Sequence, residues 1–240
     1  MAVVTALTYL ALCQRLVSET KIPGSGPTTT VSQTGINKNV VQWINQAYID
    51  IQDFYPDWNF RWYDGLISCT TGDYDYDESA NCETFNRKSF EIYDSSDDAT
   101  GASASKMSWI PWKLWRYKYA QRPQTNGDPS NVTIAPDGQV HIYPPPDSDD
   151  WRVRYSGFMP IDELSGDADV PILPNRYHML IVYKAMLDYA HFYIDQSNLA
   201  RVQIQYSDLL SRMVSDQKVE IYTRKRGVEG NASKPDSRIG

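Results

Sequence analysis

The sequence predicts an α+β protein: an antiparallel helical bundle from both chain ends, a β-rich middle insertion and an extended C-terminal tail. Apolar residues recur at three- and four-residue spacing near both ends of the 240-residue chain, which is typical of amphipathic helices. Between these regions, short runs of β-branched and aromatic residues alternate with turn residues. We therefore expect a helical core from residues 1–59 and 172–221, a β-rich insertion over 60–171 and a tail over 222–240.

Two helices are expected before the insertion. The first covers residues 5–20, with Thr5 as its N-cap and Pro23 just beyond its end. The second covers residues 36–55, where apolar side chains form a continuous stripe, and Pro56 stops it. A small, polar loop is expected to connect them.

The insertion is expected to contain five strands. They cover Phe60–Cys69, Phe90–Tyr93, Asn131–Ile134, Gln139–Tyr143 and Arg152–Phe158. A hairpin is indicated between the third and the fourth strand, because Pro136, Asp137 and Gly138 supply turn chemistry between two alternating segments.

Helical spacing returns after the insertion. It runs from Pro174 to about Ile194 and repeats from Leu199 to Met213. The linker at 195–198 is short, so these two helices should lie antiparallel to each other as a hairpin.

The C-terminal segment 224–240 differs from the rest of the chain in charge. It has five basic and two acidic residues, a net charge of +3, so the other residues carry −10 and the whole chain −7. It contains no aromatic residue. Such a segment cannot bury enough apolar surface to fold alone, so it is either solvated or ordered on a partner. Fully extended, it would reach about 55 Å.

No membrane partner is expected, because no run approaches the roughly 18 apolar residues that a spanning helix needs. The apolar N-terminal run has no positive charge before it and places Leu12 where cleavage requires a small residue, so secretion and lipidation are not expected. Three cysteines, an odd number without close pairs, predict neither a disulfide framework nor a zinc site, and they favour a reducing compartment.

Neither a metal nor a cofactor is predicted. An acidic stretch, Asp73, Asp75, Asp77 and Glu78, begins with the alternate spacing of the first three ligands of a calcium loop. A calcium loop that starts at Asp73 also needs Gly in sixth place and Glu in twelfth, where this chain has Glu78 and Thr84. The stretch is therefore interpreted as a solvated acidic loop.

No catalytic residue is predicted either. The sequence contains no GxSxG, HExxH, P-loop or GxGxxG pattern. Thirty acidic residues make chance carboxylate pairs unavoidable, so a cell-wall hydrolase stays as the enzymatic alternative. The acidic balance also argues against ordinary duplex binding, which depends on clustered Lys and Arg.

Three tryptophans, Trp109, Trp112 and Trp115, lie close together around Pro111. Core packing is the simpler interpretation of such a cluster. The alternative is a subunit interface, because tryptophan is enriched at the energetic centre of interfaces. Both interpretations stay open at this point.

Several segments occur in a characteristic order along residues 5–215. In chain order they are LCQRLVSE, GSGPTTTVSQTG, VVQWINQAYIDIQ, WNFRW, WIPWKLWRYKY, HIYPPP, WRVRYSGFMP and LPNRYHMLIVYKAMLDYAHFY. This order resembles the head-to-tail adaptor proteins of short-tailed bacteriophages, also called portal adaptors or connectors.

The resemblance implies a non-enzymatic virion structural protein, made in the host cytoplasm and located at the head–tail junction. It implies a dodecameric ring under the portal protein that extends the DNA channel, without sequence-specific DNA binding, and docks tail nozzle and fibre proteins. A lower neck or nozzle component is the other structural alternative. By position alone, the resemblance assigns portal binding to residues of the tail: Tyr222, Arg224, Lys225, Arg226, Lys234, Arg238 and Ile239.

Overall fold

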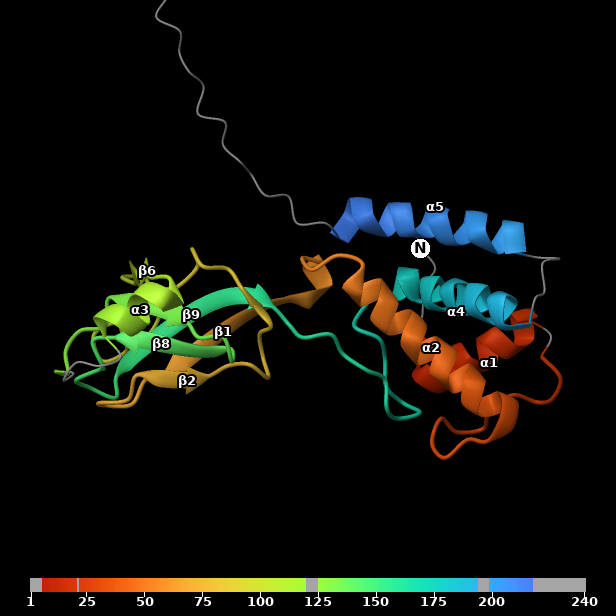
Figure 1. Ribbon diagram of the computed structural model, residues 1–240, viewed down its shortest axis with the longest axis horizontal. Coiled ribbons are helices and arrows are strands. Elements are labelled where there is room, and N and C mark those ends of the chain that lie inside the picture. The colour runs from red at the N-terminus through yellow and green to blue at the C-terminus, as the bar shows by residue number, and fades with distance from the viewer. Residues whose placement is uncertain (1–5, 21, 120–124, 194–198, 218–240) are drawn as a thin grey trace, which may run out of the picture.

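The computed structural model describes residues 6–20, 22–119, 125–193 and 199–217. Figure 1 shows an elongated molecule with two lobes. The helical lobe contains α1 (Tyr9–Thr20), α2 (Gly35–Asp53), α4 (His178–Tyr193) and α5 (Leu199–Gln217). The β lobe contains the strands and α3 (Trp112–Lys118). The α+β class predicted from the sequence is confirmed.

A single core holds the helical lobe together. α2 buries side chains spaced three and four residues apart: Val40, Ile44, Ala47, Tyr48 and Ile51. α4 is apolar around its circumference because α1, α2 and α5 all contact it. α5 lies on the outside, where only Val202 and Met213 are fully buried. The Tyr177 hydroxyl, just before α4, lies 3.4 Å from the Arg212 carbonyl near the end of α5, so these two helices run antiparallel.

The β lobe is built from two sheets. The five-stranded sheet has the order β1-β9-β4-β5, and β3 also pairs with β9, whereas the four-stranded sheet has the order β2-β8-β7-β6. The strands are β1 (Trp62–Ser68), β2 (Asp75–Asp77), β3 (Thr84–Phe85), β4 (Glu91–Asp94), β5 (Ser105–Lys106), β6 (Ser108–Trp109), β7 (Asn131–Ile134), β8 (Gln139–Tyr143) and β9 (Trp151–Phe158). β6 and β7 are parallel, and the other described pairs are antiparallel.

The two sheets pack face to face around a second core. Its buried members include Ile67, Ile92, Met107, Val132, Val140, Ile142, Val153 and Tyr155. α3 covers the other face of the four-stranded sheet, so β8 is buried on both sides, with Ile142 in the core and His141 under α3. The other face of the five-stranded sheet stays open, and Leu66 on β1 is 54% exposed there.

The chain crosses between the lobes twice, and buried polar groups fix both crossings. Arg61, in the 3-10 turn η1 (Asn59–Arg61), is almost fully buried and donates from Nε to the Met159 carbonyl at 2.9 Å. Its guanidinium also pairs with Glu83 at 2.7 Å. On α2, the Gln52 amide exchanges two hydrogen bonds with the backbone of Asp162. The second crossing is thereby held against the end of α2.

Element boundaries differ from the sequence prediction in two instructive ways. The first helix begins at Tyr9, because the Thr8 hydroxyl accepts a hydrogen bond from the Ala11 N–H (3.3 Å) and so caps it; the predicted cap, Thr5, lies outside the described residues. The second helix ends at Asp53, before Pro56. The linker at 195–198 also lies outside the described residues.

His178, at the start of α4, connects the N-terminal segment to the helical core. Its Nδ1 accepts a hydrogen bond from the Leu7 N–H, and its Nε2 lies 3.0 Å from the Leu173 carbonyl. One ring nitrogen therefore accepts and the other donates, as in a neutral imidazole. Burial lowers the pKa of His178 further, and it does the same for His141.

We expect the free energy of unfolding to fall as the pH is lowered from about 6.5. With folded-state pKa values lowered, the unfolded chain binds these two protons at a higher pH than the folded chain does. The contribution is therefore complete above the unfolded pKa of about 6.5 and is lost as the pH falls below it. Urea unfolding at about pH 7.5 and about pH 5 measures the difference, because unfolded-state carboxyl groups titrate nearer pH 4. Equal stability at the two pH values contradicts the prediction, and His178→Gln should reduce the difference.

Candidate assembly surfaces

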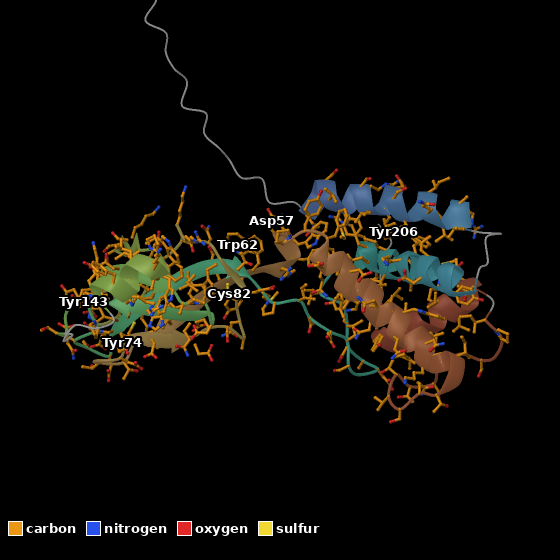
Figure 2. All side chains as sticks on the ribbon, in the orientation of Figure 1. Asp57, Trp62, Tyr74, Cys82, Tyr143 and Tyr206 are labelled. Carbon is orange, nitrogen blue, oxygen red and sulfur yellow. The ribbon has the colours of Figure 1, made fainter. Side chains whose placement is uncertain are left out.

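α3 carries two of the three predicted tryptophans and is fixed by aromatic packing. Pro111 precedes it and accepts the first backbone bonds, from Leu114 N–H (2.9 Å) and Trp115 N–H (3.0 Å). Beneath the helix, the Trp115 ring meets the Tyr143 ring edge-on at 6.2 Å. The Tyr119 ring then stacks on that of Tyr143 at 4.0 Å. α3 is thus attached to the end of β8, where Figure 2 shows Tyr143 far from the helical lobe.

The structure separates the three tryptophans that the sequence groups together. Trp115 is 2% exposed and lies in the interior of the β lobe, which leaves its ring no surface to offer a partner. Trp112 is half-buried over the His141 ring at 5.1 Å. Trp109, on β6, is half-buried, with the Arg87 guanidinium 5.2 Å from its ring. Trp112 and Trp109 are the two that keep accessible surface.

The solvent side of α3 has a different character, and we call it the α3 outer face. Its exposed members are Lys113, Leu114, Arg116, Tyr117 and Lys118. Tyr117 is 82% exposed and Leu114 41%. Within the described residues, none of the three cations forms an ion pair. The face combines positive charge with accessible aromatic and aliphatic surface, a combination that the sequence analysis did not single out.

An acidic surface lies at the end of the β lobe farthest from the helices, and we call it the acidic tip. It consists of Asp73, Asp94, Asp97, Asp98, Asp147, Asp149 and Asp150, and Figure 2 shows Tyr74, next to Asp73, far from the helical lobe. Strand register brings its three loops together, because Ser68 is opposite Arg152 and Asp94 is opposite Trp151. The acidic residues therefore come from three turns that leave the five-stranded sheet side by side.

Hydrogen bonds fix the acidic tip and keep it charged. The Thr71 N–H donates to the Asp149 carboxylate (2.6 Å), and the Ser95 N–H donates to the Asp150 carbonyl (2.9 Å). Hydrogen bonds from neighbouring hydroxyl and backbone N–H groups lower the pKa of Asp94, Asp98 and Asp149. These carboxylates remain ionised at neutral pH.

The predicted portal-binding residues, Tyr222 to Ile239, lie outside the described residues. The structure does show where the described chain leads toward them. α5 ends at Gln217 on the side of the helical lobe that faces the β lobe. Asp216 anchors this end through an ion pair with Arg176 (3.0 Å) and a hydrogen bond from the Tyr177 hydroxyl.

The predicted acidic loop is part of the sheet edge rather than a separate feature. Asp75 and Asp77 lie on β2, and Glu78 accepts a hydrogen bond from the Tyr155 hydroxyl at 2.5 Å. Among the described residues, no group of three or more His, Cys, Asp or Glu side chains is arranged to hold a metal ion.

The three cysteines are free and buried. Burial raises the pKa of the Cys13 thiol to about 12 and those of Cys69 and Cys82 to about 11. At neutral pH these thiols are protonated, and a protonated thiol is a weak nucleophile and a weak metal ligand. In the described part of the chain, the helices are too short or too polar to span a membrane.

An elongated α+β molecule with opposite charges displayed on separate surfaces has the features of a structural protein that acts through contacts with other proteins. The family model of the SU10 adaptor protein matches residues 7–229. The chain therefore belongs to the SU10 adaptor protein family, the phage head–tail adaptors, and the resemblance found in the sequence is confirmed. Membership makes it a phage structural protein of the head–tail connection that contacts other phage structural proteins. Comparison with curated proteins gave no match.

Proposed function

We propose that this protein assembles as a dodecameric ring beneath the portal, extends the DNA channel into the tail, and docks nozzle and fibre proteins without catalysing a reaction. The observation that carries the proposal is the family match, which spans both lobes and runs into the C-terminal segment as far as residue 229. The basic segment 224–240 is the proposed portal contact, because it is long enough to lie along another subunit.

The charge distribution supports a conduit for DNA. Residues 1–223 carry a net charge of −10. Phosphate that passes an acidic wall is not retained as it would be by clustered Lys and Arg, so DNA can move through such a ring. The same negative body and positive tail favour docking in one orientation on a portal subunit.

The particle mass of the full-length protein, alone and mixed with its cognate portal ring, tests the proposal. We expect a portal-dependent change from small species to one stoichiometric complex. Absence of association under all conditions would favour a lower neck or nozzle component, which binds later in assembly. A zymogram on purified cell wall tests the hydrolase alternative directly, and a cleared band would support it.

Trp112→Ala tests whether the half-buried tryptophan on α3 belongs to a subunit interface. The ring contacts His141 but is not enclosed, so we expect the unfolding free energy to fall by only about 1 kcal/mol. Ring formation on the portal should be blocked, because an interface tryptophan contributes most of its energy to association. Thermal unfolding and particle mass measure the two effects. A loss of stability near that of a core tryptophan, with rings still formed, would instead assign Trp112 to the core.

A further inference from the structure

The α3 outer face is a positive surface on a lobe that is otherwise negative. Residues 60–171 contain nineteen acidic and ten basic residues, yet α3 contributes Lys113, Arg116 and Lys118 within seven positions. Within the described residues, each of these cations lacks an ion pair. Isolated cations on an acidic body are a feature that a binding partner of opposite charge would explain.

The shape and composition of this face fit a protein partner. A shallow hollow on the helix is lined by Trp112, Lys113, Arg116 and Tyr117. Tyr117 stands 82% exposed beside it, and Trp, Tyr and Arg are the residues enriched at energetic centres of protein interfaces. Trp112 and Tyr117 offer a large contact area, and the cations beside them favour a partner surface that is acidic.

We infer that the α3 outer face of one subunit binds the acidic tip of a second copy of this chain, an inference that rests on the proposed ring. The tip supplies seven aspartates, and Arg152 beside them, which donates to the Asp149 carbonyl (2.6 Å), offsets only one of their negative charges. Within the described chain no ion pair joins the two surfaces, so they do not neutralise each other in one subunit.

The contact joins two different surfaces, so it is heterologous. A heterologous contact repeats from subunit to subunit and generates a closed ring when its rotation closes. It would place successive β lobes in contact around the ring and leave the basic tail of each subunit available to the portal. A ring with an even number of copies, such as twelve, can also be built from two different variants of the chain that alternate around it.

A nucleic acid is the less favoured occupant of the α3 outer face. α3 supplies three cations, and a nucleic acid longer than this seven-residue helix would continue over a lobe with nineteen acidic and ten basic residues. A nucleic acid held by three cations is bound weakly at physiological salt, and the acidic surface beyond α3 repels its phosphates.

A charge-swap experiment with the full-length chain and its cognate portal ring tests the inference. One variant carries K113E and R116E, and the other carries D97K and D150K, which keep the carboxylates of Asp94, Asp98 and Asp149 and remove the hydrogen bond from the Ser148 hydroxyl to Asp150. Each variant alone should lose ring completion, with binding of later copies weakened about a hundredfold, because like charges meet at every contact. Mixed in equal amounts, the two variants should restore the ring, since alternating subunits again place opposite charges together.

The matched control, K38E and R201E, reverses two exposed cations of the helical lobe. It lowers the net charge by the same amount as K113E and R116E and should leave ring formation intact. Rings formed by either variant alone, or no rescue in the mixture of folded variants, would overturn the inference. So would loss of DNA binding by the K113E/R116E variant while its rings still form, because that result assigns the surface to nucleic acid.

Failure of this inference is distinguishable from failure of the proposed function. If the wild-type chain binds the portal and neither swap affects ring completion, the adaptor function stands and the α3 contact falls. If the wild-type chain does not bind the portal, sedimentation of the concentrated free proteins at low salt still tests the contact. Self-association lost in each variant and regained in the mixture would support the contact, and no change would overturn it.

Discussion

A chain that ends at Tyr222 should fail to attach to the portal while it unfolds at the same temperature as the full-length protein. The deleted segment carries five basic residues and no aromatic residue. It can therefore form ion pairs with a partner, but it has little apolar surface to bury in a core. The core of the helical lobe closes before it: Met213 is the last fully buried residue of α5 in the described chain. Particle mass with the portal and thermal unfolding of the chain alone measure the two expectations.

The tail's charge can be separated from its length. A full-length chain with Arg224, Lys225 and Arg226 changed to Gln keeps the reach of about 55 Å but loses three positive charges. We expect its attachment to be weakened and to depend less on salt, because exposed charges steer docking and are screened by ions. A truncated chain that attaches as tightly as the full-length protein would refute a portal role for the tail. A truncated chain that melts earlier would show instead that the tail stabilises the fold.

Trp58→Ala should lower the unfolding free energy by about 3–5 kcal/mol, the typical loss for a buried tryptophan. The Trp58 side chain is fully buried at the junction of the lobes, and its Nε1 donates to the Ile51 carbonyl at 3.1 Å. Its ring also contacts those of Tyr55 (5.2 Å, edge-on) and Phe60 (5.4 Å, stacked). For a chain of this size, that loss corresponds to a melting temperature lower by roughly 6–20 °C.

Two variants serve as controls for Trp58. Trp62→Ala removes an identical side chain four positions later, but Trp62 is 38% exposed, and we expect a loss of about 1 kcal/mol or less. Trp58→Phe keeps an aromatic ring and removes the donor to Ile51, which should cost about 1–2 kcal/mol. Similar losses for Trp58→Ala and Trp62→Ala would contradict the burial that distinguishes these two positions. Figure 2 shows Trp62 near the junction of the lobes.

The regular elements with long local patterns could be predicted from the sequence. The strands Asn131–Ile134 and Gln139–Tyr143 were predicted with the bounds that the structure has. Their side chains alternate, and Gly138 adopts a positive φ of 90° in the turn between them, a conformation that glycine favours. The helix α2 could also be predicted, because its buried positions recur at helical spacing over the whole element.

The short strands could not be predicted, because their pairing depends on residues far away in the chain. β3, β5 and β6 are two residues long, and each exists because a longer strand lies beside it; Thr84, for example, is opposite Phe158. No local pattern of two residues distinguishes a strand from a turn. Tertiary contacts decide such elements.

The spacing of aromatic residues in α3 is sufficient to predict which side of this helix is buried. Trp112 and Trp115 are three positions apart, and Tyr119 follows four later, so all three lie on one face of a helix. Lys113, Leu114 and Tyr117 then fall on the opposite side, and Arg116 and Lys118 fall on its two flanks, where the structure exposes them. Helical spacing alone is enough to predict the buried aromatic face and the exposed side of this helix. It could not have supplied the acidic tip, which three separate loops form only after the strands have paired.

The paired crossings between the lobes also bear on how the chain finds its fold. α2 ends at Asp53, and η2 (Asn175–Tyr177) begins just before α4. If α2 and α4 packed together before the β lobe formed, they would close a loop of roughly 120 residues. The loss of chain entropy would cost about 4 kcal/mol. Trp62 and Phe158 are opposite each other where β1 begins and β9 ends. Once those two strands have paired, the open part of the loop is about five times shorter, and its closure costs about 1.4 kcal/mol less. Pairing within the β lobe thus lowers the entropy cost of bringing the helices before it, α1 and α2, into contact with the helices after it, α4 and α5.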